Sequence, residues 1–113
     1  MIRDMDLCRD ILLYFEKNEW EQENERTTLE DNYHILLLIE AGFLHGEANS
    51  SQASELPESF SWVRLTWSGH EFLDAARNPS VWEQARKIAG HPIPVGIMTQ
   101  LLTSLLKKKL QLP

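Results

Sequence analysis

With 113 residues, of which 42% are hydrophobic and 25% charged, the chain has the size and composition of one folded domain rather than of an intrinsically disordered protein. Its single cysteine excludes an intramolecular disulfide, and its acidic start and short apolar runs predict a cytoplasmic protein without a signal peptide or a membrane partner. The net charge of −6 divides into fourteen acidic against four basic residues over residues 1–60, and three against seven over residues 61–113, which disfavours nucleic acid as the partner of the first part.

The first predicted helix follows Asp4, whose carboxylate suits an N-cap. Its apolar positions have the i, i+3, i+4, i+7 spacing of one inward face, and they are Cys8, Ile11, Leu12 and Phe15. The polar, acidic residues 18–26 around Trp20 predict a loop with at most a short strand.

The second predicted helix begins near Leu29, because capping-box spacing occurs both from Thr27 and from Thr28. It ends at Gly42, the residue type that most readily adopts the left-handed conformation. Residues 43–48 and 60–66 then read as two strands, since the second is rich in aromatic and β-branched residues. The polar residues 49–59 between them would form a wing.

Helices fill the remainder of the chain. Ser68, three residues before Glu71, predicts a helix cap directly after the second strand. Pro79 opens a further short helix that ends at Gly90, and Pro94 opens the last one. We expect one domain over residues 1–113, with its core in residues 4–78 and a helical extension in residues 79–113.

A helix, a hairpin and a further helix in this order predict an α+β, winged helix-turn-helix-like domain with a small antiparallel hairpin wing and extra C-terminal helices. The segments RDMDL (3–7), YHILLLIEAGFL (33–44) and LTWSGHEFLDAARN (65–78) resemble the family of small bacterial and phage proteins called domain of unknown function 2513. The resemblance implies a winged helix and a phage or prophage context, and it implies no activity. Residues 19–26 depart from the family pattern, which leaves open whether the second helix of a helix-turn-helix is present.

DNA binding is the function that this fold most often performs, but the predicted second helix and wing are acidic. The candidate DNA contacts are Asn32, His34 and Arg64. Each has a structural alternative: Asn32 as solvated helix surface, His34 packed beside Tyr33, and Arg64 paired with Glu47 across the hairpin. We favour the structural role for all three.

Protein binding is the favoured hypothesis, either as a protein-interaction module or as a phage accessory protein, with weak or sequence-specific DNA-binding regulation as the alternative. The last helix carries more apolar residues than one buried stripe needs, so Leu102, Leu106 and Leu110 are the candidate surface for a homodimer or an unknown protein partner. Coverage of the first helix within the monomer is the other open interpretation.

Enzyme chemistry lacks support in the sequence, and we expect no catalytic residues, cofactor or metal. The four histidines are too far apart in sequence for the usual zinc-ligand pairs, Cys8 is expected to be a buried inert thiol, and Ser68 a helix cap. Core and core-edge packing is expected for the tryptophans, with Trp67 fixing the strand-to-helix corner, while Trp62 faces either the packing side of the sheet or solvent. The expected core consists of Leu36, Leu37, Ile39, Leu65, Phe72 and Leu73.

Overall fold

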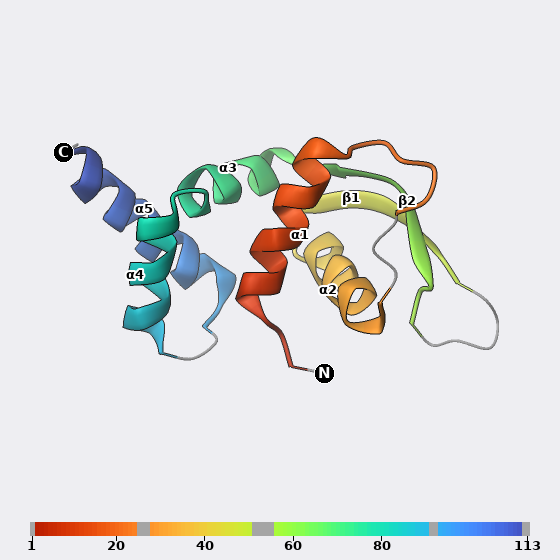
Figure 1. Ribbon diagram of the computed structural model, residues 1–113, viewed down its shortest axis with the longest axis horizontal. Helices are drawn as coiled ribbons and strands as arrows, with labels where there is room; N and C mark the ends of the chain where they lie inside the picture. Colours follow the sequence, from red (N-terminus) through yellow and green to blue (C-terminus); the bar gives the residue numbers. More distant parts are fainter. Residues whose placement is uncertain (1, 25–27, 51–55, 91–92, 112–113) are drawn as a thin grey trace. The chain divides into compact units, whose positions relative to one another are not determined.

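The computed structural model describes residues 2–24, 28–50, 56–90 and 93–111, and it confirms a mixed α+β chain with a two-stranded antiparallel sheet (Figure 1). The elements are α1 (Met5–Lys17), α2 (Leu29–Glu40), β1 (Leu44–Asn49), β2 (Ser59–Leu65), α3 (Trp67–Ala76), α4 (Pro79–Ala89) and α5 (Val95–Leu110). The chain divides into two compact units, Met1–His70 and Glu71–Pro113, which are described separately below as unit 1 and unit 2.

The first helix forms as the sequence predicts. The Asp4 carboxylate accepts hydrogen bonds from the backbone N–H groups of Asp6 at 3.0 Å and Leu7 at 3.3 Å, which satisfies two of the four donors that a helix start leaves open. The buried face of α1 consists of the four predicted residues, Cys8, Ile11, Leu12 and Phe15.

The second helix is capped by Thr28, whose hydroxyl accepts from Asp31 N at 3.1 Å. The alternative cap, Thr27, lies outside the described residues. Gly42 follows the helix with φ +83°, which fits the predicted end.

The buried face of α2 differs from the prediction. The expected core residues Leu36, Leu37 and Ile39 are only half-buried. The fully buried residues are instead Asn32, His34, Ile35 and Leu38. The run of apolar residues 35–39 surrounds the helix, so it does not reveal which side faces α1 and the hairpin.

The hairpin packs its apolar face against the first two helices: α1 contacts β2 and α2 contacts β1 (Figure 1). The two strands lie within one residue of their predicted ranges. Their register shifts at Gly46, where both Trp62 and Val63 oppose one residue, so β2 carries a bulge. A Cβ at Gly46 would lie 2.8 Å from a Val63 methyl carbon, which explains the glycine. Residues 51–55 of the predicted wing lie outside the described residues.

Residues 19–24, the edge segment, run antiparallel along the second edge of β2. Trp20 N donates to Val63 O at 3.0 Å, and Asn24 N donates to Phe60 O at 2.9 Å. The Asn24 side chain accepts from Phe60 N at 2.6 Å. The edge segment therefore protects β2 from pairing with other chains. The described residues 18–24 contain no helix, so they supply no second helix of a helix-turn-helix.

The corner between β2 and α3 is made by Thr66. Its hydroxyl accepts from Gly69 N at 3.1 Å and donates to Gly42 O. The prediction that Ser68 caps this helix is wrong, because α3 begins at Trp67 and Ser68 lies inside its first turn. A Cβ at Gly69 would lie 2.1 Å from Phe43 O, so only glycine allows this close approach.

Unit 2 holds α4 beside α5 (Figure 1). The Asn78 side chain caps α4 by accepting from Ser80 N and Val81 N, and Gly90 ends it with φ +68°. The buried residues of this unit include Phe72, Leu73, Val81, Trp82, Ala85, Met98 and Leu102. Phe72 and Trp82 meet edge to face with their ring centres 6.3 Å apart.

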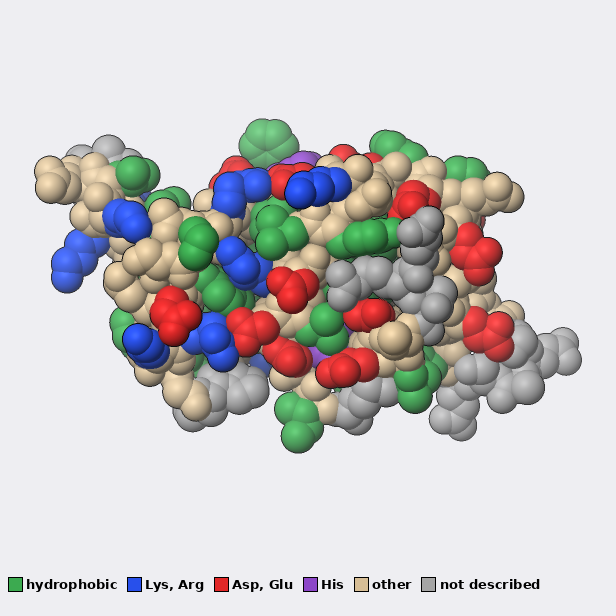
Figure 2. All heavy atoms as spheres, in the orientation of Figure 1, with side chains coloured by type: hydrophobic (Ala, Val, Ile, Leu, Met, Phe, Trp, Pro, Cys, Tyr) green, Lys and Arg blue, Asp and Glu red, His purple; other side chains and the backbone are tan. Residues whose placement is uncertain are grey.

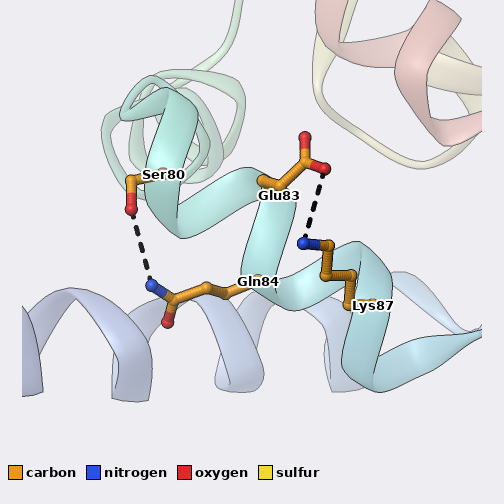
Figure 3. A network of polar contacts seen from close by, with 4 residues as sticks. All are labelled: Ser80, Glu83, Gln84 and Lys87. Atoms are coloured by element: carbon orange, nitrogen blue, oxygen red, sulfur yellow. Dashed lines mark hydrogen bonds and ion pairs between the residues drawn. The ribbon is translucent and has the colours of Figure 1, made fainter.

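The exposed side of α4 is held by local side-chain pairs (Figure 3). Gln84 Nε2 donates to Ser80 Oγ at 3.4 Å, and Lys87 Nζ lies 4.0 Å from a Glu83 carboxylate oxygen. Such exposed i, i+4 pairs stabilise a helix by only about 0.3–0.5 kcal/mol each. None of the helices in the described ranges is long and apolar enough to span a membrane.

Candidate functional site

Three of the four tryptophans lie at the surface of unit 1. Trp20 is 58% exposed, Trp62 44% and Trp67 79%, whereas Trp82 in unit 2 is 5% exposed. The prediction of core packing is therefore right for Trp82 and wrong for Trp20 and Trp67, and of the two orientations left open for Trp62 the structure shows the exposed one. Tryptophan is enriched at binding surfaces, so each exposed indole is a candidate binding residue.

Two of these tryptophans have strained backbones. Trp20 has φ +66° and Trp62 has φ +58°, and Gln111 is the only other non-glycine residue with positive φ in the described part of the chain. Each such conformation costs about 1–3 kcal/mol for a bulky residue. Strain of this kind persists where the surrounding structure fixes it, and it is frequent at functional sites.

The two strained tryptophans are linked by reciprocal hydrogen bonds. Trp20 N donates to Val63 O at 3.0 Å, and Trp62 N donates to Glu21 O at 2.8 Å, so each tryptophan bonds the residue that follows the other. The Glu21 side chain in turn accepts from the Tyr14 hydroxyl at 2.8 Å, which ties the edge segment to α1. These contacts hold both tryptophan backbones in place.

Arg64, a candidate DNA contact, covers one of the exposed indoles. Its guanidinium carbon lies 5.8 Å from the centre of the Trp20 ring, and its Nη1 donates to Leu65 O at 3.2 Å. In the register of the two strands Arg64 lies opposite His45. Glu47, which the structural alternative named as its partner, lies opposite Ser61. The guanidinium therefore makes a cation–π contact with Trp20.

An open polar groove of about 860 Å³ lies along the hairpin and the edge segment. Its lining includes Gln22, Glu23, Asn49, Glu58, Ser59 and Ser61. In sequence, Gln22 lies two residues after Trp20 and Ser61 directly precedes Trp62. The groove, with Trp20, Trp62 and Arg64, is named the outer site here.

The polar lining of the groove is ordered by Asn49. Its amide nitrogen donates to Ser59 Oγ at 3.1 Å and to Ser61 Oγ at 2.8 Å. Both amide hydrogens are thereby used within the hairpin, and the acceptor oxygen is the remaining polar atom of that side chain. No lysine or arginine is among the lining residues in the described part of the chain.

His34, another predicted DNA contact, is fully buried at 0% exposure. Its Nε2 accepts from Asp4 N at 2.8 Å, and its Nδ1 lies 2.8 Å from Glu30 O. These partners require a neutral ring with the proton on Nδ1. The ring also packs edge to face on Tyr33 at 5.5 Å, as its structural alternative states. His34 therefore joins α2 to the start of α1.

Asn32, the remaining predicted DNA contact, is 2% exposed, and its amide donates to Glu58 O at 2.7 Å. This places Asn32 between α2 and the residues that enter β2, where it differs from the solvated helix surface of its structural alternative. DNA contact by Asn32, His34 and Arg64 stays a prediction. The burial of two of them could not be predicted, because it depends on the side of α2 that faces the hairpin.

The predicted partner surface on α5 is only partly at the surface. Leu102 is 0% exposed, Leu106 is half-buried and Leu110 is 58% exposed. Ile97, on the same helix, is 53% exposed. Leu102 thus belongs to the core of unit 2, while association through the other residues stays a prediction.

Cys8 is buried, as predicted, and burial raises the pKa of its thiol to about 11. A thiol with so high a pKa is a poor nucleophile at neutral pH. Within the described ranges, no three His, Cys, Asp or Glu side chains gather in a way that could hold a metal ion.

The two units differ in charge. Unit 1 has fourteen acidic and five basic residues, a net of −9, and unit 2 has three acidic and six basic residues, a net of +3. On the face drawn in Figure 2, acidic side chains are spread over the first unit, and basic side chains are frequent over α4 and α5. The outer site therefore lies in a strongly acidic unit.

The chain is similar to proteins whose own descriptions state no activity. It matches the family described as hypothetical protein (DUF2513) over residues 2–92. It is 37% identical over 97 residues to an uncharacterized protein of Haemophilus influenzae, with 76% of each chain covered. No solved structure matches it. The family match confirms the resemblance that the sequence segments predict.

Proposed function

The chain belongs to the DUF2513 family, whose description names no activity, and we propose that it is a protein-interaction module that acts by binding rather than by catalysis. The observation that carries this proposal is the pair of exposed tryptophans, Trp20 and Trp62, each in a left-handed backbone conformation. Tryptophan is among the residues that contribute most to binding energy at protein interfaces.

The strain at these two positions supports a role outside folding. Glycine would adopt the same backbone without the steric cost, and a smaller polar side chain would avoid exposing an indole. The strain and the exposure both weaken the isolated protein, so the tryptophans are best explained by a gain on binding. The outer site is therefore the proposed interface.

The charge of unit 1 favours a protein over a nucleic acid as the partner. Phosphate contacts need lysine or arginine. Among the described residues of the outer site, Arg64 is the only basic one. Stacking surfaces for single-stranded nucleic acids combine aromatic rings with a basic groove, whereas this groove is lined by Glu23 and Glu58.

The winged-helix relationship is part of the proposal. The order of α1, the edge segment, α2, β1 and β2 supports it, although residues 18–24 lack the helix that a helix-turn-helix would need. Winged helices bind proteins as well as DNA, so the relationship alone does not choose the partner. The phage or prophage context implied by the resemblance stays a prediction.

DNA binding is the competing function, and Arg64 beside the hairpin is the residue that favours it. If it occurs, few phosphate contacts are available, so the affinity should be weak and should fall steeply with salt. A mobility-shift series at rising salt measures this. Nanomolar binding of duplex DNA at physiological salt would replace the protein-interaction proposal.

The test of the proposal compares partners captured in the native cells by wild type and by three variants. Trp20→Gly and Trp62→Gly remove the indoles and also relieve the strained backbone. Ile88→Ser is the control, since Ile88 is a similarly exposed apolar residue of unit 2 at 62% exposure. A protein lost from both tryptophan variants and kept by the control supports the outer site as an interface. Identical protein sets from all four would contradict it.

A further inference from the structure

We propose that His34 is an acid-sensitive contact: protonation of its ring separates the start of α1 from α2. This contact lies in the interior of unit 1, shares no residue with the outer site, and therefore goes beyond the proposed function. Two observations carry it, the burial of the ring and the two backbone groups that its nitrogens contact.

The two partners of the ring fix the position of its single proton. Nε2 lies 2.8 Å from Asp4 N, a backbone group that only donates, so this nitrogen accepts. Nδ1 lies 2.8 Å from Glu30 O, which only accepts, so this nitrogen carries the proton. The ring is 0% exposed, so bulk water does not reach either nitrogen. Exchanging the two roles would break both hydrogen bonds.

The hydrogen bond from Asp4 N completes the start of α1. In a capping box, the side chain three positions after the N-cap accepts from the N-cap N–H. That position in α1 is Leu7, which has no acceptor, and His34 supplies one from α2. The N-cap of α1 is therefore held by a histidine of the helix that packs beside it (Figure 1).

A second proton on the ring makes this contact repulsive. Protonated Nε2 becomes a donor, and at 2.8 Å it would face another donor. The ring would also carry a charge without access to solvent, which is costly unless the charge is paired and hydrogen-bonded. Both costs end when the ring and Asp4 move apart, because Asp4 is exposed and water then accepts from its N–H.

Charged side chains near the ring do not replace the lost acceptor. The titratable side chains on the neighbouring segments are mostly exposed or half-buried, and they are Arg3, Asp4 and Asp6 at the start of α1, Glu30, Asp31 and Tyr33 on α2, and His45 and Glu47 on β1. The buried Cys8 thiol is uncharged in acid, because burial raises its pKa to about 11. Among the described residues, no carboxylate is bonded to the ring, and the Asp4 carboxylate already accepts from two N–H groups of α1. The acidic groups therefore attract the proton only through charge screened by water, which is weaker than the contact of two donors inside the protein.

The expected opening is local. The rest of α1 is held by its buried residues, Cys8, Ile11, Leu12 and Phe15. Acid therefore frees the first turn of α1 before it unfolds unit 1.

The test compares urea unfolding of wild type, His34→Gln and His45→Gln at a series of pH values from about 7.5 to about 5, which spans the titration of histidine. Glutamine offers one acceptor and an N–H donor but does not titrate. His45→Gln is the matched control, because His45 is exposed on β1. The ratio of the folding equilibrium constants of wild type and a variant cancels the carboxylates that the two proteins share.

The expected direction follows from proton binding. An unfolded histidine takes up a proton below about pH 6.5, and a folded state that excludes this proton loses about tenfold in its folding equilibrium constant per pH unit below that value. Between about pH 6.5 and about pH 5 we expect wild type to lose about five- to thirtyfold relative to His34→Gln, and less than about twofold relative to His45→Gln. A loss relative to His34→Gln that is no larger than the loss relative to His45→Gln would overturn the inference.

Amide hydrogen exchange of wild type gives a second readout that does not depend on a variant that folds. The protection factor of Asp4 N–H, the donor to His34, should fall with pH over the same range, while those of the Leu12 and Phe15 amides within α1 stay constant. An unchanged value for Asp4 would show that the hydrogen bond survives in acid, and an equal fall at all three amides would show unfolding of the whole unit. Either result contradicts a local acid-sensitive contact.

Discussion

Replacing Trp62 by alanine and by glycine separates the strain at this position from the contacts of its indole. Both substitutions remove the side chain, but only glycine also removes the steric cost of φ +58°. At an ordinary position glycine is the less stable of the two. At position 62 we expect the order to reverse, because the backbone is left-handed.

The magnitude follows from two opposing effects. A non-glycine residue in the left-handed region costs about 1–2 kcal/mol. Glycine loses more conformational freedom on folding than alanine does, which costs about 0.5–1 kcal/mol. The difference favours Trp62→Gly over Trp62→Ala by roughly 0.5–1 kcal/mol in the free energy of unfolding. Trp20, with φ +66°, should behave in the same way.

Urea unfolding followed by circular dichroism measures both free energies. Ser61 provides the matched control, since it precedes Trp62 in β2 and is absent from the residues with positive φ. At Ser61 the alanine variant should be more stable than the glycine variant by about 0.5–1 kcal/mol. If alanine is also the more stable replacement at Trp62, the left-handed backbone is not a property of the folded protein, and the argument from strain to function fails.

Three further predictions concern the interior and the last helix. Replacing His34 by leucine should lower the free energy of unfolding by about 1–3 kcal/mol, because it leaves buried partners unsatisfied, whereas the same change at the exposed His45 should have little effect in urea unfolding. The Cys8 pKa is raised on folding from 9.0 to about 11, so its contribution to stability is fully present below pH 9.0 and is lost as pH rises toward about 11. Cys8→Ala should therefore lose less stability than wild type between these pH values. Urea unfolding midpoints measured against pH test this. Leu110→Glu should leave the fold intact and reduce any self-association measured by light scattering, while Leu102→Glu should unfold unit 2. A wild-type protein that is monomeric at high concentration would contradict the dimer hypothesis.

The sequence predicts elements well where one signal is unambiguous. The buried face of α1 is readable because only Cys8, Ile11, Leu12 and Phe15 show the spacing of an inward stripe. In α2 the apolar run 35–39 leaves the direction open, so the prediction chose Leu36 and Leu37 while the fold buries Ile35 and Leu38. Packing against the hairpin, a contact distant in sequence, decides the matter.

The outer site could not be predicted for a different physical reason. Alternation along β2 is interrupted by the bulge at Trp62 and Val63, opposite Gly46, where Trp62 is left-handed and exposed. Trp20 lies in the edge segment, which bonds β2 through its backbone. Neither feature leaves a periodic trace in the sequence. The acidic residues around Trp20 are the only signal that this segment faces water.

The most direct measurement of the central claim is the affinity of the captured partner for wild type and for the Trp20→Gly, Trp62→Gly double variant, determined by titration with the folded state checked by thermal melting. The interface proposal predicts a loss of at least about tenfold in affinity with the fold retained, since a buried tryptophan at an interface typically contributes about 2 kcal/mol or more. An unchanged affinity for a folded double variant would contradict the proposal that this protein binds through the outer site.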